Sequence, residues 1–354
     1  MSKKPKYKTA LIGTGRIGFT LGFDRKREQP ASHTMALRKN RRIKFVAACD
    51  NNQPRLDHFH RFVKKPITFA DCSNMFATDK FDIIVIAVNE NSHLDVTLDA
   101  IRAKPKLIIL EKPVALCVAD ALKIQEEAEK YKIPILVNHE RRFAQDYKIA
   151  KKYIDSIGEL ISVNARLDSG LRVYTPNEEA SGAYSLLHDG THLVDIVSYL
   201  LEEENDLSDL ESKILYNMKL NNIVFDKEKS DVVRFVSASF ESLKCPNVNI
   251  NISGKSKFFG FEIDVIGTLG RIRIGNGIFE FYKREESKLY TGFYSLEKDL
   301  KVKRPKKTKY FSNMVKNAVD FLDGKAELKS NLQTGINTLR ILEDIKNQLK
   351  NELL

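Results

Sequence analysis

The first 137 residues alternate short β-rich runs with segments of helical spacing, and this alternation constrains the fold more than any other feature. The run Asp82–Val88 is apolar on both faces, as expected of a central parallel strand that helices cover on each side. Strands that alternate with helices favour a doubly wound parallel sheet. We expect strands at 8–13, 43–50, 66–69, 81–88, 106–110 and 133–137, and helices near 54–64, 92–103 and 118–131.

After about residue 140, strand-like runs follow one another with few helices between them. This succession predicts a largely antiparallel sheet in an α+β domain. We therefore expect two domains, residues 1–137 and 138–354, with the C-terminal helix as a candidate for packing back on the first. The expected strands are 159–168, 212–221, 231–241, 247–253, 259–266, 271–274 and 278–283, and the expected helices 143–155, 183–201, 310–322 and 331–350.

A glycine-rich turn, Gly13-Thr14-Gly15-Arg16-Ile17-Gly18, follows the first expected strand. Its G-x-G-x-x-G spacing permits a tight turn and lets backbone N–H groups approach a pyrophosphate. The second strand ends in Asp50, where a carboxylate can accept hydrogen bonds from the adenine ribose. Together they predict a dinucleotide-binding Rossmann domain. Asp50, followed by Asn51, favours NAD over NADP, although Arg55 nearby keeps NADP as the alternative.

The spacing departs from the usual pattern, because about 32 positions separate Gly18 from Asp50 instead of roughly 20. The segment Thr20–His33 therefore indicates an insertion before or within the first helix, and Pro30 supports a loop there. Two interpretations remain open. The insertion either contacts substrate at the mouth of the cofactor cleft or is a surface excursion.

Composition limits the other classes of function. No apolar run reaches the roughly 18 residues that cross a bilayer, and the charged start at residues 1–6 has no signal core, so we expect a cytoplasmic protein. The net charge of +11 is spread along the chain, and the run Lys301–Lys309 lacks interleaved aromatics. We expect a solvated loop there, no nucleic-acid partner, and some steering of anionic substrates.

The four cysteines are widely scattered and form no C-x-x-C pair, so reduced thiols are expected rather than a zinc site or a disulfide framework. Cys49 and Cys72 are expected to be small buried or half-buried side chains. Cys117 and Cys245 complete the set.

Three further segments carry a resemblance to a known family. They are Val88-Asn89-Glu90-Asn91-Ser92-His93, Glu111-Lys112-Pro113 and the HDGTHLVD segment at 188–195. Together with the glycine turn, Arg142-Phe143 and the VIGTLG segment at 265–270, they make the chain similar to the glucose-fructose oxidoreductase / inositol dehydrogenase / rhizopine catabolism (Gfo/Idh/MocA) family. The resemblance implies hydride exchange between a nicotinamide and a hydroxyl-bearing carbon of a sugar, cyclitol or sugar derivative.

The resemblance also implies the roles of two residues. Lys112 would lie between nicotinamide and substrate, where an ammonium can donate to the reacting oxygen. His192 corresponds to the histidine of the family's D-x-x-x-H motif and would act as the acid/base, a task that suits its near-neutral pKa. The resemblance places His93 near the nicotinamide ribose, and a capping role for His93 on the following helix is the alternative. The expected cofactor contacts are Gly13, Gly15, Arg16, Ile17, Gly18, Asp50, Asn51, Val88, Asn89, His93, Glu111 and Lys112.

The sequence departs from the family at His188, which stands where the family usually has aspartate. Asp189 would point about 100° away on a regular helix, unless Gly190 makes the turn irregular. We hypothesise a cationic pocket, with His188 near the catalytic pair, that takes an acidic substrate such as a uronate or sugar nucleotide. A zinc site at His188 and His192 is the rival interpretation, but no third ligand is evident, so no metal is expected. Candidate substrate contacts are His139, Arg142, Arg172, Tyr174, Tyr184 and Asp189.

The expected pocket lies at the carboxyl ends of the parallel strands, with the second sheet as its roof. We expect a homodimer or homotetramer, because the open face of the second sheet needs cover. A dinucleotide-binding regulator without catalysis is the alternative, because a fold does not fix a function.

Overall fold

A computed structural model describes residues 6–203 and 214–353. Within these residues the chain forms two compact units. The first takes its residues from 1–144 and 307–336, and the second from 145–306 and 337–354. The division of function between residues 1–137 and 138–354 stays a prediction.

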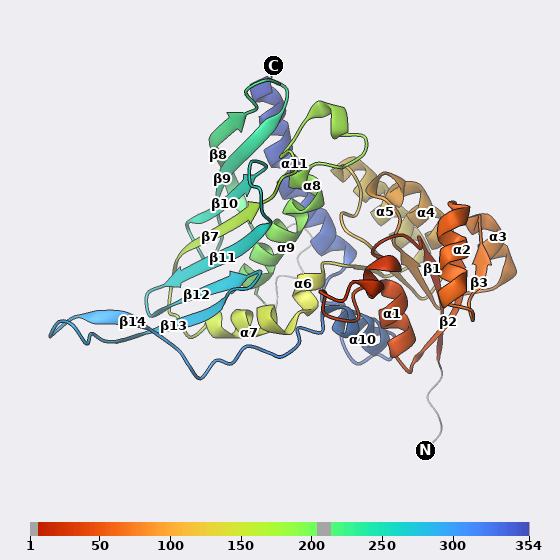
Figure 1. The fold of residues 1–354 in the computed structure, drawn as a ribbon, viewed down its shortest axis with the longest axis horizontal. Helices are drawn as coiled ribbons and strands as arrows, with labels where there is room; N and C mark the ends of the chain where they lie inside the picture. The colour runs from red at the N-terminus through yellow and green to blue at the C-terminus, as the bar shows by residue number, and fades with distance from the viewer. Residues whose placement is uncertain (1–5, 204–213, 354) are drawn as a thin grey trace. The chain divides into compact units, whose positions relative to one another are not determined.

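Six parallel strands form the sheet of the first unit, in the order β3-β2-β1-β4-β5-β6, and Figure 1 labels β1, β2 and β3. Ile12 pairs with Cys49 and Ile86, and Ile86 pairs with Leu110, so these four strands end level with one another. The loops that follow them therefore begin side by side at one edge of the sheet. The strands are β1 (Tyr7–Ile12), β2 (Ile43–Cys49), β3 (Ile67–Phe69), β4 (Ile83–Ile86), β5 (Leu107–Leu110) and β6 (Ile135–Val137).

Helices complete the expected Rossmann-type architecture of this unit. The late helix α10 (Tyr310–Leu322) belongs to it, because Phe311, Met314 and Val315 are buried in the same apolar core as Leu11. The other helices are α1 (His33–Lys39), α2 (Gln53–Phe62), α3 (Cys72–Thr78), α4 (His93–Arg102), α5 (Val118–Tyr131) and α6 (Glu140–Phe143), with 3-10 turns at Thr20–Phe23 and Glu90–Ser92.

An eight-stranded sheet organises the second unit, in the order β14-β13-β12-β11-β7-β10-β9-β8. All its pairings are antiparallel except that of β7 with β10, which confirms the largely antiparallel sheet. The first two residues of the strand expected at 212–221 lie outside the described residues. The strands are β7 (Leu160–Asp168), β8 (Tyr216–Phe225), β9 (Val233–Glu241), β10 (Val248–Ser253), β11 (Gly260–Gly267), β12 (Gly270–Gly275), β13 (Phe279–Glu286) and β14 (Tyr294–Lys298).

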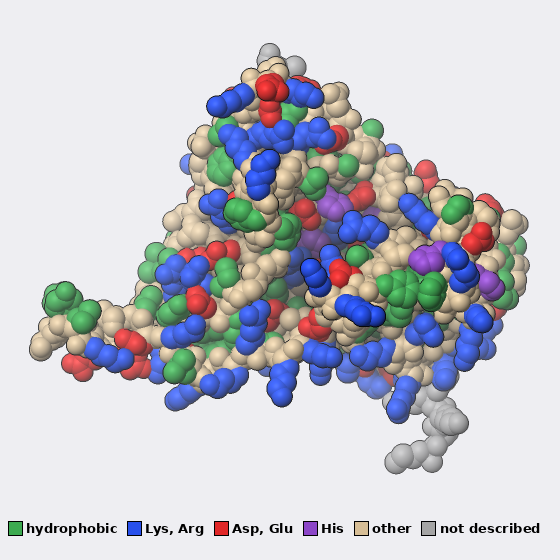
Figure 2. Space-filling model, viewed as in Figure 1, with side chains coloured by type: hydrophobic (Ala, Val, Ile, Leu, Met, Phe, Trp, Pro, Cys, Tyr) green, Lys and Arg blue, Asp and Glu red, His purple; other side chains and the backbone are tan. Residues whose placement is uncertain are grey.

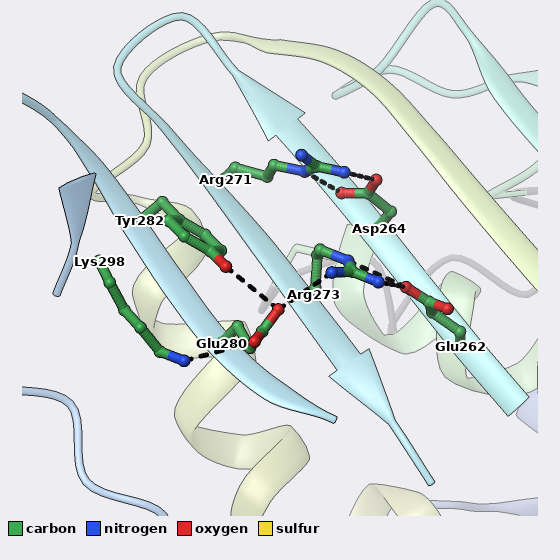
Figure 3. A network of polar contacts seen from close by, with 7 residues as sticks. All are labelled: Glu262, Asp264, Arg271, Arg273, Glu280, Tyr282 and Lys298. Carbon is green, nitrogen blue, oxygen red and sulfur yellow. Dashed lines mark hydrogen bonds and ion pairs between the residues drawn. The ribbon is translucent and has the colours of Figure 1, made fainter. Parts of the chain in front are cut away.

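The two faces of this sheet differ in chemistry. Along β11, Phe261, Ile263 and Val265 are buried, whereas the alternating Glu262 and Asp264 are partly exposed. On that second face, ion pairs join neighbouring strands, and Figure 3 shows them running from β11 across β12 to β13. The helices of this unit are α7 (Gln145–Ile154), α8 (Ser185–His188), α9 (Gly190–Leu201) and α11 (Leu332–Leu353), with a 3-10 turn at Pro176–Glu178. The start of α11, as far as Ile336, belongs to the first unit.

On the face in Figure 2, lysine and arginine side chains are interspersed with acidic ones. Residues 301–309 form neither helix nor strand and are mostly exposed, as expected of a solvated loop. Among the helices of the described residues, none has the length and apolarity to cross a membrane.

Candidate active site

The glycine turn after β1 has a geometry that only glycine allows. Gly13 has a φ of +95°, a conformation that side-chain-bearing residues rarely adopt, and a Cβ there would lie 2.3 Å from the carbonyl oxygen of Ala87. A Cβ on Gly18 would lie 2.0 Å from the carbonyl oxygen of Gly13. Gly13 therefore lets the turn lie close against the end of β4, and Gly18 lets the turn fold tightly on itself.

Gly15 differs, because space is left where its side chain would be. The one heavy atom of the described residues within 4 Å of a Cβ at Gly15 is Nη1 of Arg55, at 3.8 Å. The neighbouring Arg16 is exposed, and Ile17 packs against the core. The turn thus offers open backbone beside a guanidinium, an arrangement that fits the pyrophosphate of a dinucleotide.

The insertion predicted at Thr20–His33 interrupts the first helix. One turn forms after Gly15, whose carbonyl oxygen accepts from the N–H groups of Phe19 and Thr20. The chain then leaves and returns, and the N–H of His33 donates to the carbonyl oxygen of Ile17 at 3.0 Å. Helix α1 therefore continues from the single helical turn that precedes the insertion, so the insertion lies within the first helix.

Asp50 fixes the glycine turn from the end of β2. Its Oδ2 accepts from the N–H and the hydroxyl of Thr14 at 2.7 and 3.0 Å, and its Oδ1 accepts from the N–H of Asn52 at 2.9 Å. The side chain is buried, whereas Asn51 is exposed. Each carboxylate oxygen can accept two hydrogen bonds, so Asp50 retains capacity for ribose hydroxyls.

Glu111 and Lys112 follow β5 at the same edge of the sheet. Glu111 is buried, and its Oε1 accepts from His33 Nε2 at 2.6 Å and from Asn138 Nδ2 at 2.7 Å. Burial alone would raise the pKa of Glu111, but hydrogen bonds from His33 and Asn138 and the charges of His33 and Lys112 together lower it. Glu111 is therefore an ionised anchor beside the half-buried Lys112.

His93 fixes the other side of the Lys112 turn. Its Nδ1 lies 2.6 Å from the carbonyl oxygen of Pro113, and its Nε2 lies 3.3 Å from that of Val88. Burial lowers the pKa of His93, so we assign a neutral ring with the proton on Nδ1. The ring makes these contacts with backbone carbonyls instead of capping α4, and the exposed Asn89 lies in the intervening loop. The capping interpretation is wrong.

Sequence reasoning missed two of the residues that hold this turn. His33 comes from the end of the insertion, and Asn138 directly follows β6. Neither belongs to a recognisable motif. Only Asn138 carried a signal, because it stands at the carboxyl end of a parallel strand, where ligand sites gather.

His188, Asp189 and His192 lie in the second unit, where the helix expected at 183–201 is broken. Helix α8 ends at His188, Asp189 has φ −102° and ψ −30°, and α9 begins at Gly190. The turn is thus irregular, as Gly190 allowed. All three side chains are half-buried. Lys112 and His192 belong to different units, so their pairing stays a prediction.

The remaining substrate candidates have varied surroundings. Tyr174 and Tyr184 are buried and pack edge to face, with ring centroids 5.4 Å apart. The hydroxyl of Tyr174 donates to Glu179 at 3.2 Å, and the half-buried Arg172 pairs with Glu178. In the first unit, Arg142 is buried with Nη1 3.5 Å from the carbonyl oxygen of Lys329, and Nδ1 of His139, also buried, lies 3.3 Å from the Ser330 hydroxyl. Their contacts with substrate stay predictions.

A metal site finds no support in the part of the chain that the structure describes. No group of three or more histidine, cysteine, aspartate or glutamate side chains there is placed to hold an ion. His188 and His192 therefore have no third ligand among these residues.

The first unit matches a family of known activity. Residues 7–139 match the model of GFO_IDH_MocA, an oxidoreductase family with an NAD-binding Rossmann fold. Over these residues the chain is similar to the Gfo/Idh/MocA oxidoreductases. The match indicates that NAD is the cofactor of the first unit.

Individual Gfo/Idh/MocA relatives are distant. Glucose-6-phosphate 3-dehydrogenase of Bacillus subtilis is 25% identical over 78% of this chain and 76% of its own. Myo-inositol 2-dehydrogenase of Thermotoga maritima is 21% identical over 75% and 74%. The match to the rhizopine catabolism protein MocA of Rhizobium meliloti, 26% identical, spans 40% of each chain, less than half of that relative's length.

Solved structures share the fold over almost the whole chain. A dehydrogenase from Chromobacterium violaceum superposes with a TM-score of 0.78 at 14% identity, over 99% of this chain and 98% of that one. The WlbA dehydrogenase of Bordetella pertussis, in complex with NADH and UDP-GlcNAcA, superposes with a TM-score of 0.71 at 16% identity, over 98% and 97%. At these identities the likeness shows the fold alone.

Proposed function

We propose that the protein is a dehydrogenase or reductase that exchanges a hydride between a nicotinamide and a secondary hydroxyl or ketone. The substrate is a sugar, a cyclitol or an acidic sugar derivative, sugar nucleotides included. One observation carries the proposal: the glycine turn, its acid Asp50 and the Glu111–Lys112–Pro113 turn follow strands that end level at one sheet edge. The first unit thus provides both the turn that would bind the cofactor's phosphates and the cation that suits the reacting oxygen.

In the proposed mechanism, each catalytic side chain has one task. The ammonium of Lys112 donates a hydrogen bond to the reacting oxygen and stabilises the charge that develops there. His192 takes the hydroxyl proton during oxidation and returns it during reduction. A bound nicotinamide would accept the hydride during oxidation and donate it during reduction. Glu111 and His93 keep Lys112 in place through the contacts on either side of it.

We propose an acidic substrate, because His188 replaces the aspartate that the family usually has. Replacing that carboxylate by an imidazole removes one negative charge next to the segment of His192, and the chain's net charge of +11 attracts anions. The names of two similar proteins support this choice, since one acts on glucose 6-phosphate and the other binds UDP-GlcNAcA.

The experiment is an absorbance assay of reduced nicotinamide with uronates, sugar phosphates, sugar nucleotides, inositols and free sugars, with NAD and NADP. Turnover that His192→Asn abolishes, while NADH affinity persists, supports the dehydrogenase. NADH binding without turnover anywhere on the panel would favour a non-catalytic regulator. Faster turnover of neutral polyols than of acidic sugars would overturn the acidic substrate.

The variant His188→Asp tests the charge argument directly, because it restores the family's carboxylate at one position. We expect it to lower kcat/KM for acidic substrates and to raise the ratio of neutral to acidic turnover. His188→Asn is the matched control, since it alters the ring without adding charge. An unchanged ratio in His188→Asp would show that this position does not select substrate charge.

We further propose that the enzyme is a cytoplasmic homodimer or homotetramer. The hairpin of β13 and β14 supports self-association, because Leu289, Tyr290, Phe293 and Tyr294 on it are all more than half exposed. Light scattering of the purified chain measures the oligomeric state. A monomer at micromolar concentration would contradict the proposal.

A further inference from the structure

Two thiols meet beside the cofactor turn. Cys49 is the last residue of β2 and Cys72 the first of α3, and their Sγ atoms are 3.3 Å apart. Cys49 is buried at 2% exposure, and Cys72 is half-buried and so reachable by small solutes. A disulfide has an S–S distance of about 2.05 Å, so a small displacement would allow a bond.

The two thiols differ in reactivity. The hydrogen bond from Cys49 lowers the pKa of the Cys72 thiol, against the opposing effects of burial and of Asp71, Asp99 and Asp50. The same contact, with burial, raises the pKa of Cys49. Cys72 is the more exposed thiol and the one that ionises more readily, so it reacts first, and Cys49 is the thiol that follows.

Cys49 is tied directly to the glycine turn. Its carbonyl oxygen accepts from the N–H of Gly13 at 2.8 Å, and the next residue, Asp50, holds both donors of Thr14. The N–H of Asp50 in turn donates to the carbonyl oxygen of Phe69 on β3. A covalent link at Cys49 therefore acts on the glycine turn that we expect to bind the pyrophosphate.

We propose that Cys49 and Cys72 form a reversible oxidative modification site for peroxides, which controls NAD binding. The Cys72 thiolate attacks one peroxide oxygen, the O–O bond breaks, and a sulfenic acid and hydroxide form. The Cys49 thiol then attacks the sulfenic sulfur, the S–O bond breaks, and water leaves. In total, two thiols lose two electrons and two protons, and the peroxide becomes two waters. A small dithiol reverses the reaction.

The expected consequence is weaker NADH binding in the oxidised protein. The bond draws the end of β2 toward α3, so Gly13 and Thr14 lose their positions relative to the strand end. We expect the Kd for NADH to rise about fivefold or more, the lower range of coupling between two sites. The inference does not depend on which substrate the enzyme uses.

The test uses the full chain treated with hydrogen peroxide, then alkylated and digested for mass spectrometry, with NADH titrated by fluorescence before and after. We expect a peptide pair linked through Cys49 and Cys72, a raised Kd, and recovery with dithiothreitol. Cys72→Ser and Cys72→Ala should keep the affinity of the reduced protein and lose the response to peroxide. Cys117→Ser, at another half-buried cysteine, should respond as the unaltered chain does.

Three results would overturn the proposal. One is the absence of the linked pair after peroxide treatment of the unaltered chain. The second is a peroxide effect on NADH affinity that persists in Cys72→Ser and Cys72→Ala. The third is a linked pair that leaves the affinity unchanged. Because the linkage is read from peptides, its absence is distinct from any failure to find a substrate.

Discussion

At the residue scale, the glycines of the turn have separate tasks that substitution can distinguish. Gly13 and Gly18 lack space for a side chain, whereas Gly15 has it. We expect Gly15→Ala to leave the thermal midpoint nearly unchanged and to raise the Kd for NADH about tenfold, because its methyl group occupies the space of the pyrophosphate. Gly18→Ala, the matched control, should lower the midpoint itself. Equal loss of midpoint in both variants, read by calorimetry, would contradict this division.

His33 is a positioning residue whose effect passes through Glu111. His33→Leu removes one donor to Glu111, so Lys112 loses part of its anchor, and we expect kcat to fall about tenfold or more with NADH affinity preserved. His33→Gln keeps a donor near Nε2 and should restore much of the activity. If His33→Gln is as impaired as His33→Leu, shape rather than the hydrogen bond matters.

The pH profile gives a second readout for His33. In the unaltered chain, the donors lower the pKa of Glu111, so its carboxylate persists to low pH. In His33→Leu the hydrogen bond and charge of His33 no longer oppose the effect of burial on Glu111, so its pKa rises. The acidic limb of the kcat/KM profile should therefore move to higher pH. An unmoved limb would mean that the charge of Glu111 does not matter for turnover.

At the element scale, the end of α10 is fastened to the first two strands of its unit. Asp323, the residue after α10, accepts from both terminal nitrogens of Arg42 at 2.8 Å and from the Tyr7 hydroxyl at 2.7 Å. Hydrogen bonds from Arg42, then Lys325 and Tyr7, hold the pKa of Asp323 well below its usual range. These contacts join α10 to the first unit, although the helix lies far along the chain from Tyr7 and Arg42.

The ion pair between Asp323 and Arg42 makes the free energy of unfolding depend on pH in a defined direction. Because the folded-state pKa of Asp323 is depressed, its contribution is complete above the unfolded pKa of about 3.9 and is lost as pH falls further. Asp323→Asn should therefore unfold more easily in urea near neutral pH, and the difference from the unaltered chain should shrink below about pH 4. Asp320→Asn, which removes an exposed pair with Lys316, is the control and should have little effect. A difference independent of pH would contradict the prediction.

Element by element, most of the fold could be predicted, and the exceptions have physical reasons. Short apolar runs located the parallel strands, but α3 escaped because Met75 is its one buried residue, although Asp71 caps it. The edge strand β14 is mostly exposed and so shows little apolar pattern. The site was predicted as far as motifs reach, namely Gly13 to Gly18, Asp50 and Lys112. The hydrogen bond between His33 and Glu111 depends on where the insertion rejoins the first helix, and no local sequence pattern records that point.

At the scale of the whole molecule, the chain leaves the first unit after residue 144 and returns to it at residue 307. Packing, and not position in the sequence, therefore decides to which of the two units a residue belongs. Phe311 is the clearest case, because it is buried in the first unit with its ring edge-on to His33, at a centroid distance of 5.1 Å. A residue late in the chain thus supports the histidine that anchors Glu111.

Phe311→Ala and Phe281→Ala test this assignment as a matched pair. Both rings are about 1% exposed, but Phe281 lies on β13 of the second unit against Tyr153. Each truncation should lower the free energy of unfolding by about 3–5 kcal/mol. Only Phe311→Ala should also weaken NADH binding and speed proteolysis within residues 1–144, because only it loosens the core under the glycine turn. If Phe281→Ala weakens NADH binding as much, the two units do not unfold independently, and nicotinamide binding reports the stability of the whole chain instead of that of its first unit.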